Sequence, residues 1–366
     1  MVYVEGSAQN QRRTSPGRLR LTIVIVNYES WPETDRLAGM LLAEPEAVSG
    51  TCEVVVVDNA SRGSIPAGLA DPRPGLRLIV RPDNGGFAAG VNAGWRSSSA
   101  GWFLILNPDV EIRAGFLARV LDRLDALDAR GTHRPGIVGF GLKNPDGTPQ
   151  GSVGAFPTLA RSIREQFIPR PRRKYRPAWH VGAGPVDWVT GACMLVDAAL
   201  IAAAGGMDED FFLYHEEVAF CRVARSLGWR VEFDPSLEVI HRHPLQNRPI
   251  SPKMRVVTRH SKLLYFRKHL PGWQFHALAA FVSLESAVRG AWSSRLGRCE
   301  EAWAWRVIAG IVGRLRRGDS VRGGEVRELA GSLSGSPRMA GPHDPQSHPA
   351  RKPRKAHRSG GTPLGR

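Results

Sequence analysis

Phe103-Leu104-Ile105-Leu106-Asn107-Pro108-Asp109-Val110 is a short apolar run with one carboxylate just beyond its end. Such a run, bounded by turn signals, is typical of a parallel strand that is covered on both faces. Pro108 has no amide hydrogen for a sheet hydrogen bond, so we expect the strand to end near Asn107. Asp109 then lies at the carboxyl edge of the sheet, where open α/β sheets bind ligands. A carboxylate there suits a divalent cation that carries a diphosphate, and a plain turn aspartate fits the pattern equally well.

Three earlier apolar segments alternate with helical patterns and are predicted to be strands. They are residues 21–26, 53–57 and 76–80. The turn after the first, Asn27-Tyr28-Glu29-Ser30, lacks the Gly-x-Gly-x-x-Gly spacing of a dinucleotide-binding dehydrogenase. The second ends in Asp58, which suits either a hydrogen bond to a nucleobase or ribose or an Asx turn. The alternation predicts an α/β fold with a mostly parallel central sheet flanked by helices.

A glycine-rich segment, residues 84–94, follows the third strand and leads into a helical pattern. Glycine lets the backbone approach a ligand closely, and the first amides of a helix favour phosphate. We therefore expect this segment to lie beside a bound phosphate group.

The second half of the sheet is predicted from shorter signals. Strands are expected at residues 137–140, at 186–196 with a glycine kink, and at 230–233. Residues 144–185 are rich in Gly, Pro and Arg and are expected to form a surface excursion, either a solvated loop or a basic rim for anionic lipid or diphosphate. His241 follows the last apolar segment and suits a metal ligand, a phosphate partner or a surface histidine.

Two adjacent acids, Glu216 and Glu217, precede a helical pattern formed by Phe220, Val223, Ala224 and Leu227. They are therefore expected in the first helical turn, on or beside its inward face. Acids at that position often only stabilise the helix dipole. Here they follow an aromatic run, residues 211–214, which favours a general base in a walled pocket.

The totals restrict the class of protein. The chain has 366 residues, 42% hydrophobic content and a formal charge of +16, so it has a sizeable core and favours anionic partners. Its four cysteines show no metal-binding spacing and are expected to be reduced, in a cytoplasmic protein. Residues 1–19 are basic and are expected to be disordered, with no signal peptide. No apolar stretch is long enough to span a membrane.

The composition changes after Pro271. Residues 271–317 alternate apolar and arginine-rich positions and are predicted to form amphipathic basic helices, either at a membrane surface or packed on the preceding α/β domain or in a homodimer. Residues 318–366 are rich in Gly, Pro, Ser and Arg and are expected to be a disordered basic tail. Nucleic acid is not an expected partner, because the chain has no aromatic-basic module.

Taken together, these segments resemble a family 2 glycosyltransferase of the GT-A fold, in the bacterial rhamnosyltransferase-like branch. The resemblance covers residues 20–270, which would form the glycosyltransferase domain. It rests on seven motifs in the family's order: residues 25–28 (IVNY), 56–61 (VVDNAS), 84–87 (NGGF), 106–110 (LNPDV), 188–192 (WVTGA), 207–221 and 262–269 (KLLYFRKH).

The resemblance implies a role for each matching position. Glu217 matches the family's catalytic base, with Glu216 beside it as the second candidate, and Asp109 and His241 match residues near the metal and the diphosphate. Asp58 would read the pyrimidine of the donor. The remaining nucleotide-sugar-binding positions implied by the motifs are Asn27, Asn84, Gly85, Asn92, Asn107, Trp188 and Gly191. The chain departs from the usual pattern at three positions, with Asn107 for the first acid of D-x-D, Glu217 for aspartate and Ala219 for a further aspartate.

The implied reaction is inverting transfer of a sugar, such as rhamnose, from a dTDP- or UDP-sugar to a hydroxyl of a glycan or polyprenyl-linked acceptor. The implied cofactor is a divalent metal, Mg²⁺ or Mn²⁺. The implied location is the cytoplasm, including the cytoplasmic face of the membrane. A non-catalytic protein that binds nucleotide sugars or polysaccharides is the alternative, because of Asn107 and Ala219. A nucleotidyltransferase is disfavoured, because residues 27–30 do not form the basic glycine loop that it needs.

Overall fold

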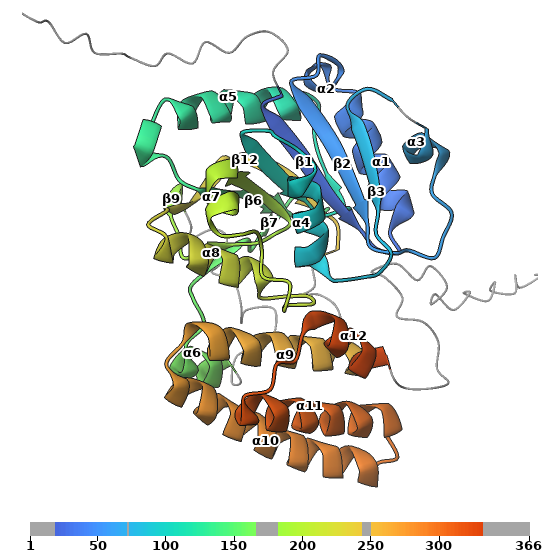
Figure 1. Cartoon of the computed structure of the whole chain (residues 1–366), viewed down its shortest axis with the longest axis vertical. Coiled ribbons are helices and arrows are strands. Elements are labelled where there is room, and N and C mark those ends of the chain that lie inside the picture. Colours follow the sequence, from blue (N-terminus) through green and yellow to red (C-terminus); the bar gives the residue numbers. More distant parts are fainter. Residues whose placement is uncertain (1–18, 72, 166–181, 244–249, 332–366) are drawn as a thin grey trace, which may run out of the picture.

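The computed structural model describes residues 19–71, 73–165, 182–243 and 250–331 (Figure 1). A mixed sheet runs through the larger part of the molecule, with strand order β3-β2-β1-β4-β11-β6-β12-β5. Its strands are β1 (Leu21–Asn27), β2 (Cys52–Asp58), β3 (Leu76–Val80), β4 (Trp102–Leu106), β5 (Val110–Glu111), β6 (Ile137–Lys143), β11 (Cys193–Asp197) and β12 (Val231–His241). Short strands β7 (Pro149–Gln150) and β9 (Gly184–Pro185) extend its edges, and β8 (Val153–Gly154) pairs with β10 (Trp188–Val189) in a separate ribbon.

Helices cover the sheet and form a second layer beside it (Figure 1). Those of the first part of the chain are α1 (Trp31–Leu42), α2 (Pro45–Val48), α3 (Ala67–Ala70), α4 (Phe87–Arg96), α5 (Phe116–Asp128), α6 (Leu159–Arg164), α7 (Ala198–Ala203) and α8 (Glu216–Ser226), with a 3₁₀ turn at Gly131–His133. The C-terminal layer consists of α9 (Pro252–His269), α10 (Gly272–Arg295), α11 (Cys299–Arg317) and α12 (Gly323–Gly331).

The expected α/β architecture is confirmed. Strands β3, β2, β1 and β4 are parallel neighbours, β12 is parallel to β6, and β11 lies antiparallel between β4 and β6. Consecutive apolar residues form these strands because both faces are covered. In β1, Ile23 and Ile25 pack toward α1 and α5, whereas Val24 and Val26 pack toward α4 and α8. All four side chains are buried, and each contributes about 1.5–3 kcal/mol of transfer free energy.

Three expectations about single elements are wrong. Residues 186–196 form two strands, β10 and β11, because Thr190, Gly191 and Ala192 leave the ladder between them. Residues 230–241 form one strand, β12, whose register shifts between Asp234 and Glu238. Leu227 caps the end of α8 and is exposed, so the inward face of that helix ends one turn earlier than the spacing indicated.

The C-terminal layer extends further than expected. Helix α12 lies inside the segment from residue 318 that was expected to be disordered, and Val326 and Ala330 are buried against the other helices. That expectation is therefore wrong for residues 318–331, because a short apolar stripe is enough to hold a helix that packs against an existing layer of helices. Residues 1–18 and 332–366, and the basic run at residues 170–174, lie outside the described residues.

Side chains of three elements meet at Trp305 in the centre of this layer. The guanidinium groups of Arg255 and Arg259 from α9 and of Arg289 from α10 lie 5.3, 5.9 and 5.7 Å from its ring centroid. Glu285 of α10 compensates two of these cations, at 2.8 Å from Arg259 and 3.1 Å from Arg289. Among the described residues, no helix combines the length and the apolar character needed to cross a bilayer.

Candidate active site

Two polar residues stand side by side where β1 and β2 end. Asn27 pairs with Asp58 in the parallel register, and its Nδ2 donates to Asp58 Oδ1 at 2.7 Å. The backbone amide of Ser61 donates to the other oxygen, Asp58 Oδ2, at 3.0 Å. Asn27 Oδ1 accepts from Thr34 Oγ1 at 2.8 Å, so the Asn27 side chain braces the strand ends. The Asp58 carboxylate is thereby held in one orientation at the carboxyl edge of the sheet, with lone pairs left to accept from a ligand.

A carboxylate and an imidazole meet at the neighbouring edge. Strand β5 pairs with the end of β12, with Val110 opposite His241, and this pairing brings Asp109 Oδ1 to 3.3 Å from His241 Nε2. The ring's other nitrogen, Nδ1, lies 2.7 Å from Gln150 Oε1. Gln150 Nε2 donates to Asn144 Oδ1 at 2.9 Å, which fixes the orientation of the Gln150 amide. His241 Nδ1 must therefore carry the proton that it donates to Gln150.

This arrangement has a chemical consequence for Nε2. With Nδ1 protonated, the Nε2 atom of a neutral His241 points its lone pair at the lone pairs of the Asp109 carboxylate, and the two repel. A proton or a metal cation between them removes this repulsion. Burial raises the pKa of Asp109, but the hydrogen bond from His241 and the charges of His241 and His243 outweigh burial, so the net pKa lies below the usual range. Asp109 and His241 therefore fit a divalent cation as a pair.

The pair alone does not complete a metal coordination sphere. Within the described ranges, no group of three or more His, Cys, Asp and Glu side chains gathers around one point. A magnesium-type ion is commonly bound by one or two protein groups together with substrate phosphates and water. The residues present fit that mode, in which the substrate supplies the remaining oxygen ligands.

The glycine-rich turn before α4 is closed onto the chain itself. Gly86 donates its amide to Asn84 Oδ1 at 3.0 Å, and Phe87 donates its amide to the carbonyl of Phe212 at 3.1 Å. A Cβ at Gly86 would lie 2.1 Å from that carbonyl oxygen, at a φ of +92°. The expectation that the first amides of this helix face a phosphate is therefore wrong for Gly86 and Phe87. Asn84 shapes the turn, and Gly85 leaves room for Ala89 and Arg81.

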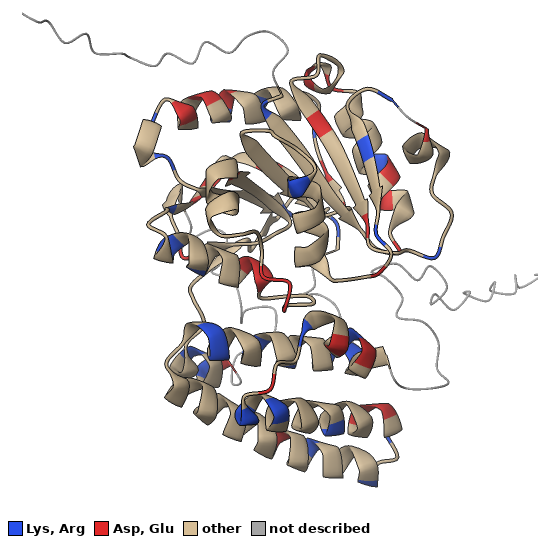
Figure 2. Ribbon diagram, viewed as in Figure 1, with Lys and Arg blue, Asp and Glu red and all other residues tan. Residues whose placement is uncertain are grey.

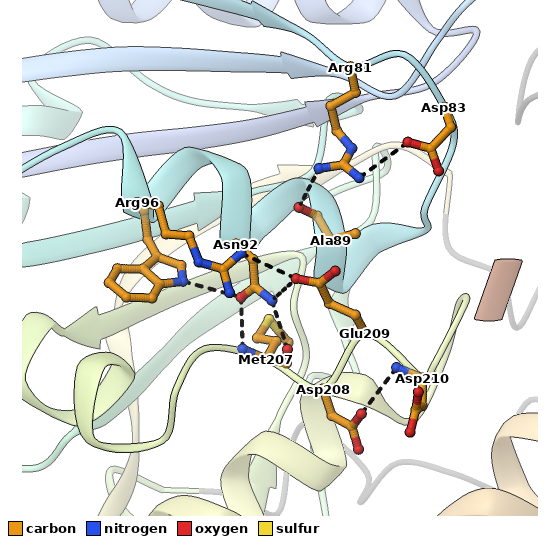
Figure 3. Close-up of polar contacts among 10 residues, drawn as sticks. Arg81, Asp83, Ala89, Asn92, Arg96, Met207, Asp208, Glu209 and Asp210 are labelled. Atoms are coloured by element: carbon orange, nitrogen blue, oxygen red, sulfur yellow. Dashed lines mark hydrogen bonds and ion pairs between the residues drawn. The ribbon is translucent and has the colours of Figure 1, made fainter. Parts of the chain in front are cut away.

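Asn92 was expected to bind the nucleotide sugar, and the structure gives it another role. Its Nδ2 donates to the Met207 carbonyl at 2.8 Å and to Glu209 Oε1 at 2.7 Å, and its Oδ1 accepts from the Met207 amide at 2.8 Å and from Trp95 Nε1 at 3.2 Å (Figure 3). The side chain is buried and its hydrogen-bonding capacity is used within the chain. Asn92 therefore clamps the segment from Met207 onward to α4.

Trp188 was also expected at the nucleotide sugar, and this expectation is wrong. The indole is fully buried, its Nε1 donates to the Ala155 carbonyl at 3.0 Å, and a Cβ at Gly154 would lie 2.2 Å from its ring. Trp188 packs the β8–β10 ribbon. The sequence pattern of an aromatic residue before Thr-Gly-Ala does not distinguish a ligand platform from a core residue.

The segment before α8 has an unusual backbone. Tyr214 and His215 have φ values of +69° and +70°, a conformation that non-glycine residues adopt rarely and at a cost of about 1–3 kcal/mol each. These two residues turn the chain sharply into the first turn of α8, where Glu216 and Glu217 are both buried, as expected. Strain at consecutive residues directly before two buried acids is typical of a functional site.

Close contacts through residues 191 and 192 connect Glu217 to the turn that carries Asp109. The Asn107 amide donates to the Ala192 carbonyl at 3.1 Å, so the turn lies beside the gap between β10 and β11. One residue earlier, a Cβ at Gly191 would lie 3.1 Å from the Phe87 ring and 3.8 Å from Glu217 Cβ. Gly191 thus sits between the Asn107 turn, the glycine-rich loop and the acid-bearing helix, and its lack of a side chain lets all three approach.

The C-terminal layer holds the acidic loop, residues 207–215, from the other side (Figure 2). Lys268 of α9 pairs with Asp208 at 2.7 Å and with Asp210 at 2.6 Å. Ser261 Oγ donates to the Leu213 carbonyl at 2.8 Å, and a Cβ at Gly323 would lie 2.9 Å from the Phe212 amide nitrogen. Sequence reasoning gave these residues and Gln150 no individual role, because nothing in the local pattern shows which partner lies 48 to 111 residues away in the chain.

Comparisons with known proteins identify related glycosyltransferases. Residues 22–182 match the model of glycosyl transferase family 2. The N-acetylglucosaminyl-diphospho-decaprenol L-rhamnosyltransferase of Mycobacterium tuberculosis is 28% identical over 273 residues, which cover 69% of this chain and 86% of that protein. The low-salt glycan biosynthesis hexosyltransferase Agl10 of Haloferax volcanii is 28% identical over 234 residues, 62% of this chain and 68% of that protein.

A solved structure, the mannosyltransferase PcManGT from Pyrobaculum calidifontis in complex with GDP-Man and Mn²⁺, is also similar. It shares 16% sequence identity, covers 83% of this chain and 88% of its own, and superposes with a TM-score of 0.45.

The family match and the relatives identify this chain as a glycosyltransferase. Residues 22–182 belong to glycosyl transferase family 2, and the relatives place the chain in its rhamnosyltransferase-like branch.

Proposed function

We propose that this enzyme transfers a sugar, rhamnose being the first candidate, from a nucleoside-diphosphate donor to a hydroxyl group with inversion at the anomeric carbon. The observation that carries the proposal is the contact path from the Asn107 turn through Ala192 and Gly191 to Glu217. It supports one continuous site, with a diphosphate near Asp109 and His241 and a buried carboxylate across from it.

In the proposed reaction, Glu217 accepts the proton of the acceptor hydroxyl while that oxygen forms a bond to the anomeric carbon. The bond from this carbon to the diphosphate oxygen breaks on the opposite face, and its electron pair leaves with the nucleoside diphosphate. A divalent cation held by Asp109 and His241 would neutralise the charge that develops on the diphosphate. Gln150 orients the His241 ring so that Nε2 faces this charge.

For the donor, we propose a pyrimidine nucleotide, dTDP or UDP, whose base donates an N–H hydrogen bond to the Asp58 carboxylate. The two hydrogen bonds from Asn27 and Ser61 support this role because they fix the carboxylate before a ligand arrives. Asn107, which lies in the turn beside Asp109, and Gly191 remain our candidates for contacts to the sugar.

For the acceptor, we propose a glycan on a polyprenyl carrier at the cytoplasmic face of a membrane. The name of the mycobacterial relative supports a lipid-linked acceptor, and the excess of basic residues in this chain supports an anionic partner. We further propose that residues 20–270 form the catalytic domain and that residues 271–331, which pack with α9 in the C-terminal layer, face the membrane.

The test compares two isosteric variants of adjacent acids. We expect Glu217→Gln to lower transfer by about 10²–10⁴-fold, because the amide cannot accept the proton, while thermal stabilisation by the donor is retained. Glu216→Gln is the matched control and should keep most of the activity. Full turnover by Glu217→Gln would contradict the assignment, and loss only in Glu216→Gln would exchange the two roles.

The same assay tests the non-catalytic alternative. An enzyme slowly hydrolyses its nucleotide sugar when no acceptor is present, whereas a binding protein gives a thermal shift without turnover. Repeating the thermal-shift measurement with several nucleotide sugars identifies the donor. Comparing the shifts with and without Mn²⁺ measures how far donor binding at Asp109 and His241 depends on a cation.

A further inference from the structure

Helix α10 is apolar on two opposite faces, and only one of them is packed. Its inner face carries Phe275, Leu278, Ala279 and Val282, which are buried against the neighbouring helices. Its outer face also carries large apolar side chains, and these are exposed. They are Trp273 (65%), Phe281 (41%), Leu284 (64%), Val288 (61%) and Trp292 (61%). An isolated exposed leucine is ordinary, but a whole exposed helix face of this kind marks an interaction surface.

The exposed residues form one continuous stripe. From Phe281 to Trp292 they recur every three to four positions, and the exposed alanines Ala277, Ala280, Ala287 and Ala291 continue the spacing and connect Trp273 to the rest. With 24 residues the helix is about 36 Å long, so the stripe runs over most of that length. We call residues 273, 277, 280, 281, 284, 287, 288, 291 and 292 the α10 stripe.

The position of α10 leaves the second half of this stripe uncovered by the described chain. Helix α10 is the outermost element of the C-terminal layer, on the side away from the sheet, and α9 lies between it and the acidic loop (Figure 1). Ala277 and Phe281 line a pocket with Leu159 and Ile163 of α6, whereas Leu284, Val288 and Trp292 are more than 60% exposed.

The chemistry around the stripe favours an anionic lipid surface. Tryptophan near each end is suited to the boundary between headgroups and acyl chains, where an apolar ring with one polar group is stable. Residues 272–317 contain seven arginines and three glutamates, a net charge of +4. Arg289, Arg295 and Arg298 are exposed along and beyond the second half of α10. Each arginine near an anionic membrane contributes about 1 kcal/mol.

A second copy of the chain is a poorer match for the same surface. Glu285, the one acid of α10, pairs with Arg259 and Arg289 and its side chain is only 8% exposed, so the helix that carries the stripe presents Arg289 and Arg295 without an exposed carboxylate of its own. Two such faces brought together would bury apolar area but leave the positive charges uncompensated.

We propose that the α10 stripe is a membrane-docking surface, on which the helix lies parallel to a bilayer containing anionic lipid, with the tryptophans at headgroup depth. This inference rests on the proposed function only in its choice of a lipid-linked acceptor. Docking through α10 would turn the C-terminal layer toward the membrane and hold the acidic loop one helix layer above it.

The experiment is flotation of the full chain with vesicles of phosphatidylcholine, with and without phosphatidylglycerol. We expect binding to the anionic vesicles, a weaker association at about 0.5 M salt than at about 0.1 M, and at least about a tenfold loss of binding in Leu284→Glu and in Trp292→Glu. Val48→Glu is the matched control, because Val48 is 73% exposed on α2, remote from α10, and this variant should bind like the parent chain.

The outcomes separate this proposal from the proposed function. Binding needs neither donor nor turnover, and transfer to a water-soluble acceptor should be unchanged in the two α10 variants. Equal binding by the parent chain and both α10 variants, with unchanged circular dichroism, would overturn the proposal. So would a dimer in solution that dissociates in Leu284→Glu, because the stripe would then be an interface between copies.

Discussion

Asn92→Asp removes the clamp between α4 and the acidic loop while changing the shape of the side chain very little. The carboxylate still accepts from the Met207 amide and from Trp95 Nε1, but it can no longer donate to the Met207 carbonyl or to Glu209. Two hydrogen bonds are lost at about 1 kcal/mol each, and the Met207 carbonyl is left without a donor inside the protein. The new charge also faces Glu209, although solvent screens this repulsion because Glu209 is partly exposed.

We therefore expect the free energy of unfolding to fall by about 2–4 kcal/mol, with a larger fall in turnover than in donor affinity, because Glu217 lies beyond the loosened loop. Urea unfolding of the full chain gives the first quantity, and transfer kinetics give the second. Adding Glu209→Gln restores a donor and should recover part of the stability. A single variant as stable and as active as the parent would refute the clamp.

Two further predictions concern the backbone and a buried histidine. Gly86→Ala places a Cβ against the Phe212 carbonyl at a positive φ and should lower the free energy of unfolding by well over about 2 kcal/mol. Gly147→Ala is the control, because Gly147 has a similar φ but open space around it, and it should cost about 1 kcal/mol. Equal losses in the two variants would contradict the contact at Gly86. Burial lowers the pKa of His260 to about 4. Between pH 6.5 and about 4, therefore, the unfolded chain takes up a proton at this residue and the folded chain does not. The free energy of unfolding should fall by up to about 3 kcal/mol as the pH drops through this window. His260→Gln, which can still donate to the Val321 carbonyl, should flatten that dependence in urea unfolding, and an unchanged pH profile would contradict the assignment.

The strands could be predicted almost to the residue where the sequence is continuously apolar. Residues 21–26, 53–57 and 76–80 lie within β1, β2 and β3, because a run covered on both faces has few alternative structures. The signal failed where a strand departs from regular pairing. The gap at Gly191 between β10 and β11 and the register shift in β12 are set by packing with Phe87 and with β6, neither of which is near in sequence.

The candidate site divides in the same way. Residue type and strand position were sufficient to place Asp58, Asp109 and His241 at or just beyond strand ends, because the carboxyl ends of parallel strands share one edge. They were not sufficient for Asn92 and Trp188, whose hydrogen-bond partners are backbone atoms 115 and 33 residues away. The local sequence around a polar or aromatic residue near a predicted site does not show whether its side chain contacts a ligand or another part of the same chain.

The acidic loop is braced on both flanks, by α4 through Asn92 and Gly86 and by the C-terminal layer through Lys268 and Gly323. A segment tied to two rigid bodies has little freedom to swing, and active-site lids are drawn from weakly held segments. The carboxylate of Glu217 is thus preset before any substrate arrives. Because α9 contacts this loop through Lys268 and Ser261, substitutions in α9 that never touch a substrate can shift Glu217, the proposed proton acceptor.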